Sequence, residues 1–191
     1  VAVCEQTESP AEAKKRGSKS IVNRDVVRIV TPGTITEDTI LPARRGQALT
    51  AIAFATGGAD AAIATCDVST GALEISALPA ENLPERLAAL PVSELLVTEE
   101  DEARPFVRRA LEALRVPVTR RPARAASAKS GEAALKSAFK VAALDAFGSF
   151  TKAELAASGL LLDYLSLTQA GAAIRLDTPR RGAGTSTLSI D

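Results

Sequence analysis

The chain has 191 residues, of which 46% are hydrophobic and 24% charged, and its 23 basic and 23 acidic side chains give a formal net charge of zero. This composition is that of a globular protein with enough apolar material for a core, and it excludes a disordered tail. No apolar run approaches the ~20 residues needed to span a bilayer and no signal-peptide pattern is present, so we expect no membrane contact and a cytoplasmic location.

The first forty residues predict a strand, a short helix and a second strand. Residues 1–4 are β-like, and Ser9 can cap a helix that starts at Pro10, with Glu12 completing a capping box. Gly17 limits that helix to two turns. Residues 26–30 then predict a strand.

A Thr-Pro-Gly-Thr turn at residues 31–34 follows that strand. Pro32 fixes its own backbone angle, and we expect Gly33 to permit the reversal through its conformational freedom. We also expect Val26, Val27 and Val30 to be partly buried, with Arg28 pointing outward.

The middle of the chain predicts an α/β layer with a mixed sheet. Two apolar runs of strand length, 48–56 and 61–69, flank Gly57-Gly58, which is a hairpin signal, and a third strand covers 72–78. Helices and strands then alternate: a helix at 82–90 capped by Asn82, a buried strand at 93–98, an amphipathic helix at 103–114 and a strand at 116–119. The apolar stripe of the 103–114 helix consists of Phe106, Val107, Ala110, Leu111 and Leu114.

The last third predicts an exposed basic loop and two helices. Residues 120–130 form the loop, and Ser130 or Gly131 opens a helix that runs to about Lys140. Thr151 and Glu154 form a second capping box for a long helix, 152–169, which is apolar on most sides and therefore packs between neighbours. Gly171 is expected to end it, and residues 187–190 to begin a strand.

Residue types that are missing narrow the chemistry. The chain has no histidine, which excludes a Ser-His-Asp triad, a Cys-His pair and histidine-ligated zinc within it. Cys4 and Cys66 form no C-x-x-C, so we expect two small buried apolar side chains in a reducing compartment. The chain also lacks methionine, and we interpret it as a segment of a longer protein.

Asp67 is the strongest candidate for metal chemistry, because it lies on a probable central strand just before a tight turn. Two-metal nuclease chemistry needs several convergent carboxylates, and Glu74, Glu94 and Asp145 are the available helpers, with no spacing that brings them together. The alternative is that Asp67 hydrogen-bonds the turn that follows it, which is the more common role.

Basic side chains gather in two regions despite the neutral total. Lys14, Lys15, Arg16, Lys19, Arg24 and Arg28 surround the first strand-turn unit, and a second group of arginines lies between residues 104 and 124. Such groups suit phosphates, although many are simply solvated faces. Only 3% of residues are aromatic, so no base-stacking surface is available and any DNA contact would be to the backbone.

Several stretches resemble the MutS family of DNA mismatch-repair proteins. They are "VAVCEQTESPAEAKKRG" followed by "VVRIVTPGTITED", and then, in the same order, "CDVSTGAL", "LLLDYLSLTQ" and "STLSID". The resemblance covers nearly the whole chain. It implies four parts: the end of a mismatch-recognition domain, 1–31, as a short α+β piece; a linker, 32–47; a connector domain of ribonuclease-H-like α/β fold, 48–150; and the start of the lever and core region, 151–191, beginning with the long helix.

The resemblance also implies partners and functional residues. Arg24 would reach DNA phosphate, with Lys15, Arg16 and Lys19 as weaker candidates in the same patch. The connector would dock MutL, with Lys136 on the 131–140 helix as a candidate contact. The parent protein would be a homodimer that binds mismatched double-stranded DNA, ATP and Mg²⁺, whereas we expect this segment, which lacks Walker motifs, to have no cofactor, metal, nucleotide site or enzymatic activity.

Two alternatives stay open from the sequence. One is a divalent-metal nuclease of ribonuclease-H-like fold that uses Asp67, and the other is a binding module with no DNA role.

Overall fold

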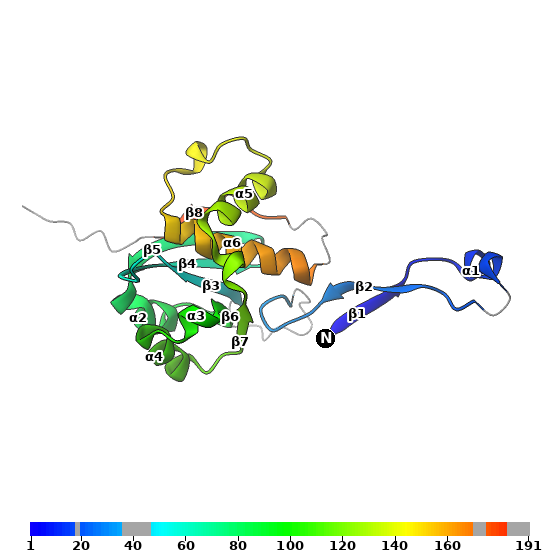
Figure 1. Cartoon of the computed structure of the whole chain (residues 1–191), viewed down its shortest axis with the longest axis horizontal. Coiled ribbons are helices and arrows are strands. Elements are labelled where there is room, and N and C mark those ends of the chain that lie inside the picture. Colours follow the sequence, from blue (N-terminus) through cyan, green and yellow to red (C-terminus); the bar gives the residue numbers. More distant parts are fainter. Residues whose placement is uncertain (18–19, 36–46, 170–174, 183–191) are drawn as a thin grey trace, which may run out of the picture.

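The computed structural model describes residues 1–17, 20–35, 47–169 and 175–182. They form a two-stranded ribbon at the N-terminal end and an α/β unit with a six-stranded sheet. In Figure 1 the ribbon extends to one side of the α/β unit and ends in a short helix. Among these residues, no helix combines the length and the apolarity needed to cross a bilayer.

The ribbon consists of β1 and β2, which pair antiparallel, with α1 between them. Their bounds are Ala2–Gln6 for β1, Pro10–Arg16 for α1 and Arg24–Ile29 for β2. The predicted capping box is confirmed, because Ser9 and Glu12 exchange both of its hydrogen bonds. A short α+β piece therefore precedes the sheet, as the sequence predicts.

The sheet of the α/β unit has the order β7-β6-β3-β4-β5-β8. The pairs β3–β4 and β4–β5 are antiparallel, whereas β3–β6, β6–β7 and β5–β8 are parallel. The strands are β3 Ala48–Phe54, β4 Asp60–Asp67, β5 Ala72–Pro79, β6 Val92–Thr98, β7 Val118–Arg121 and β8 Arg180–Arg181. The predicted mixed sheet is confirmed, and the predicted hairpin at Gly57-Gly58 is present, with positive φ at both glycines.

Helices cover both faces of this sheet (Figure 1). The helices are α2 Leu83–Ala88, α3 Glu99–Glu102, α4 Pro105–Leu114, α5 Ala128–Phe139 and α6 Lys152–Thr168, and the 3₁₀ turns are η1 Ala80–Asn82, η2 Ala123–Ala126 and η3 Asp145–Phe147. One core lies between the sheet and α5 and α6, and a second lies between the sheet and α2 and α4. Along the central strands β3, β4 and β6, side chains alternate between the two cores, so both faces are apolar there, as in a sheet covered on both sides.

The long helix α6 is part of this unit. Its capping box, Thr151 with Glu154, is present as predicted, and its apolar side chains, including Leu160, Leu161 and Leu165, are fully buried in the core against β3 and β4. The boundary predicted after residue 150 stays a prediction. A helix apolar on most sides fits this place, between the sheet and α5.

Two local expectations are wrong. Asn82 makes no side-chain capping bond, because it ends η1 in a helical conformation and α2 continues from it. The helix α5 begins earlier than predicted, capped by Ser127, and η2 occupies part of the predicted loop. The expected end of α6 at Gly171 and the strand at 187–190 fall outside the described residues.

Candidate nucleic-acid interface and interdomain junction

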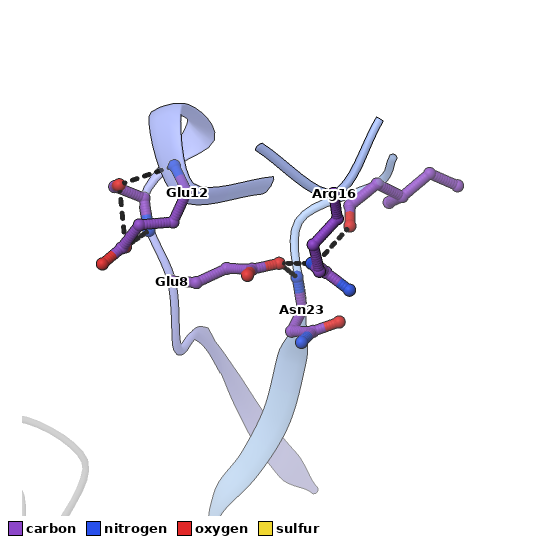
Figure 2. Close-up of polar contacts among 6 residues, drawn as sticks. Glu8, Glu12, Arg16 and Asn23 are labelled. Atoms are coloured by element: carbon purple, nitrogen blue, oxygen red, sulfur yellow. Dashed lines mark hydrogen bonds and ion pairs between the residues drawn. The ribbon is translucent and has the colours of Figure 1, made fainter. Parts of the chain in front are cut away.

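The outer end of the β1–β2 ribbon is organised by Glu8. Its carboxylate forms an ion pair with Arg16 and accepts a 2.7 Å hydrogen bond from the backbone N–H of Asn23. The same Arg16 guanidinium donates to the carbonyl of Ile21. These contacts tie the end of α1 to the start of β2 (Figure 2).

The start of α1 is held by its own network. Glu12 Oε2 accepts from both the backbone N–H and the hydroxyl of Ser9, at 2.8 Å each. The backbone bond and then the hydroxyl bond lower the pKa of Glu12, because both favour the charged carboxylate. The two acidic side chains drawn in Figure 2, Glu8 and Glu12, are therefore both engaged within the ribbon.

The predicted DNA-contact residues separate into two kinds in the structure. The side chains of Lys15 and Arg24 are exposed and form no hydrogen bond or ion pair with the described part of the chain, so their charges face solvent. Arg16 is engaged within the ribbon, because its guanidinium pairs with Glu8 and donates to the Ile21 carbonyl. Lys19 falls outside the described residues.

Arg28, which the sequence analysis pointed outward, is half-buried. Its guanidinium donates a 3.2 Å hydrogen bond to the carbonyl of Thr34. The Arg28 side chain can reach the turn at residues 31–34 because β2 ends at Ile29, just before that turn.

The turn at residues 31–34 is closed by its two threonines. The Thr34 N–H donates to the Thr31 carbonyl at 3.0 Å, and the Thr31 N–H donates to Thr34 Oγ1 at 2.9 Å. Gly33 does not adopt a left-handed conformation, so the expectation that its backbone freedom permits the reversal is wrong. The glycine is needed for space: a Cβ there would lie 2.6 Å from Leu49 Cδ1 and 2.9 Å from Glu94 Cβ.

Glu94 joins this turn to the α/β unit. It lies on β6, only 1% exposed. Its Oε2 accepts a 2.9 Å hydrogen bond from the Gly33 N–H, and its Oε1 accepts from the hydroxyls of Thr119 at 2.6 Å and Tyr164 at 2.7 Å. Burial raises the pKa of the Tyr164 phenol, and the adjacent Glu94 carboxylate adds to this.

From the sequence, Glu94 was expected only as a helper for Asp67, and its place at the junction was not predicted. The available signal was a single acid inside the apolar run "SELLV". A buried acid needs hydrogen-bond partners. The partners of Glu94 are Gly33, Thr119 and Tyr164, which lie 61, 25 and 70 positions away in the sequence, so the sequence does not identify them.

Asp67 holds the turn after β4. Its Oδ1 accepts from the N–H of Ser69 at 2.9 Å, the hydroxyl of Ser69 at 2.6 Å and the N–H of Thr70 at 3.3 Å. Of the proposed helpers, Glu74 pairs with Arg86. Within the described ranges, no three His, Cys, Asp or Glu side chains group as a metal site would require.

The cysteines differ from each other. Cys66 is fully buried, as expected, and desolvation followed by the nearby Asp67 charge raises the pKa of its thiol to about 12. Cys4 is exposed on β1, so the expectation of a buried side chain is wrong for it.

Lys136, the candidate partner contact, lies on α5. It is half-exposed and forms an ion pair with Glu132 at 2.6 Å, one helical turn earlier. Beside this helix, a hollow of about 730 Å³ opens toward α6, with Arg124, Lys140 and Leu162 among its lining residues.

Comparison with known proteins gives two family matches, one on each side of residues 40–46. Residues 1–39 match the family described as MutS domain I, and residues 47–177 match MutS domain II. The second match contains α6, in agreement with its packing on the sheet.

Curated relatives match over the whole chain. Proteins named DNA mismatch repair protein MutS are 46% identical over 194 residues in Ruegeria pomeroyi, 49% over 191 residues in Cereibacter sphaeroides and 42% over 191 residues in Caulobacter vibrioides. In each comparison the chain is covered completely and spans 21% of the relative's length.

Proposed function

Because the chain belongs to the MutS family of DNA mismatch-repair proteins, we propose that it works in mismatch repair by contacting the backbone of mismatched DNA through its β1–β2 ribbon. The observation that carries this proposal is the free charge of the Arg24 and Lys15 side chains, which neither Glu8 nor Glu12 neutralises because Glu8 is bonded to Arg16 and Glu12 to Ser9. Free cations of this kind bind phosphate without reading sequence.

The test is DNA binding by the chain at several salt concentrations. Arg24→Glu should weaken binding and reduce the salt dependence, because one phosphate contact is lost and a repulsive charge is added. Arg109→Glu is the matched control, since Arg109 is an exposed arginine on α4 and the change in net charge is the same. Equal losses in the two variants would assign the effect to net charge, and an affinity insensitive to salt and to Arg24→Glu would refute the contact.

The α/β unit is proposed to be a connector of ribonuclease-H-like fold. In support, its five longer strands have the order 3-2-1-4-5 when numbered along the unit, with the first three antiparallel and the last two parallel. In this role it carries conformational changes between the mismatch-recognition domain and the ATPase core. The boundaries at residues 31, 47 and 150 stay predictions.

Docking of MutL is proposed for the exposed side of α5 around Lys136. Pull-down of MutL by the parent protein should fall when Lys136 is changed to Glu, which repels Glu132 and reverses the charge of the surface. Arg109→Glu again serves as the control. Undiminished capture by the Lys136 variant would remove this residue from the interface.

The remaining activities are proposed for the parent protein: homodimer formation and binding of ATP with Mg²⁺, while this segment acts without catalysis. The engagement of Asp67 by its own turn supports a non-enzymatic role. Incubating the chain with Mg²⁺ or Mn²⁺ and DNA tests it, since cleavage that disappears in Asp67→Asn would establish the nuclease instead.

A further inference from the structure

We propose that Glu94 is a positioning residue that sets the orientation of the β1–β2 ribbon on the α/β unit. This inference rests on the proposed function only in giving the ribbon a DNA partner. The geometry itself concerns one buried carboxylate and the groups that converge on it from separate elements.

The first step is the convergence. Glu94 accepts hydrogen bonds from the turn at Gly33, from Thr119 on β7 and from Tyr164 on α6. All three donors are neutral, so a carboxylate that is 1% exposed is satisfied by hydrogen bonds. Such an arrangement is directional, because each bond constrains the angle as well as the distance of its donor.

The second step is the fit of the turn. Thr34 is fully buried, and the absence of a Cβ at Gly33 lets the turn backbone lie against Leu49 and Glu94. The turn is therefore held at Gly33 by Glu94, whose other carboxylate oxygen bonds Thr119 and Tyr164.

The third step is the direction of the ribbon. β2 ends at Ile29, two residues before the turn, and Arg28 on that strand bonds to the turn carbonyl at Thr34. A rotation of the turn on Glu94 would thus be carried into β2 and, through the β1–β2 pairing, to the charged tip near Arg24. Glu94 is far from that tip and acts on it through the turn.

The experiment measures the ribbon's orientation by pulsed electron resonance between two spin labels. The exposed Cys4 on β1 takes one label and Ser137→Cys on α5 the other, while Cys66 is fully buried and protected. We expect one narrow distance distribution in the otherwise unchanged chain. Gly33→Ala, whose Cβ pushes the turn away from Glu94, should broaden or shift it.

Glu94→Leu is the second variant, because it removes both acceptor oxygens while keeping a side chain of similar volume. It should broaden the distribution as Gly33→Ala does, with thermal unfolding of the α/β unit still cooperative. Asn23→Ala, at the far end of the ribbon, is the matched control and should leave the distribution unchanged, since only the backbone of Asn23 is bonded.

Three results would overturn the proposal: a broad distribution in the unchanged chain, a narrow and unshifted one in Gly33→Ala or in Glu94→Leu, or loss of the folded α/β unit in both variants. The last result would make Glu94 a residue for folding alone. Because no DNA is present, a chain that fails to bind DNA but shows the expected distances would refute the proposed function and leave the positioning role intact.

Discussion

The contact between α5 and α6 depends on two glycines facing each other. A Cβ added at Gly131 would lie 1.7 Å from the carbonyl oxygen of Leu155 and 3.1 Å from the backbone nitrogen of Gly159. Ordinary van der Waals contact begins at 3.4 Å, so the oxygen would be at half the needed separation. Backbone atoms cannot turn away as a flexible side chain can, so Gly131→Ala must push the two helices apart.

Two effects of opposite sign compete in this substitution. Replacing glycine by alanine in a helix stabilises by at most about 1 kcal/mol. Overpacking of this severity costs roughly 3 kcal/mol, the upper end of the usual range, because opening the contact also loosens Leu135 and Leu160 in the core. We therefore expect a net loss of about 2 kcal/mol, which lowers the melting temperature by roughly 4–8 °C for a chain of this size.

Thermal and urea unfolding followed by circular dichroism measure this loss. Ser137→Ala, at an exposed position of the same helix, is the control and should raise stability by a few tenths of a kcal/mol, about the difference in helix propensity. A Gly131→Ala variant as stable as the unchanged chain, or more stable, would show that the helices separate at no cost and would refute the reasoning.

Three further predictions concern stability. Burial raises the pKa of the folded Cys66 thiol from about 9 to about 12. The stability that the protonated thiol contributes is complete below the unfolded pKa and is lost as pH rises to 12, so the free energy of unfolding falls by at most about 1.4 kcal/mol per pH unit. Between pH 8 and pH 10.5, urea unfolding should show a smaller decrease in this free energy for Cys66→Ala than for the unchanged chain. Asp67→Ala should cost about 1 kcal/mol, measured the same way at pH 7, because the turn loses its acceptor; no change would contradict the turn role. Thr151→Ala should also cost about 1 kcal/mol through loss of the α6 cap, whereas Lys152→Ala, one residue later, should be nearly neutral in the same melt.

Local signals predicted the elements well where one short pattern decides the outcome. Ser9 with Glu12 and Thr151 with Glu154 are such patterns, and both capping boxes are present because every atom involved lies within one helical turn. Asn82 failed for the opposite reason, since the preceding η1 turn placed it inside a helical run.

The junction could not be predicted because its contacts join residues that are far apart in the sequence. Gly33 lies in a turn that the sequence indicates, yet its reason for being glycine is the approach of Glu94 from 61 residues away. Arg16 and Arg24 look alike in sequence, and only Glu8 distinguishes the engaged cation from the free one. Charge runs thus locate a surface, whereas the structure selects the residues on it.

The strand β8 has a consequence for how the chain behaves in concentrated solution. It is only two residues long, both are exposed arginines, and it lies along β5 at the outer side of the sheet. Arg181 is anchored there through the buried Glu154 at 2.9 Å. A last described strand that is this short and carries two positive charges is a poor template for strand addition by another molecule, so the part of β5 that it covers, Glu74 and Ile75, is protected from edge-to-edge pairing.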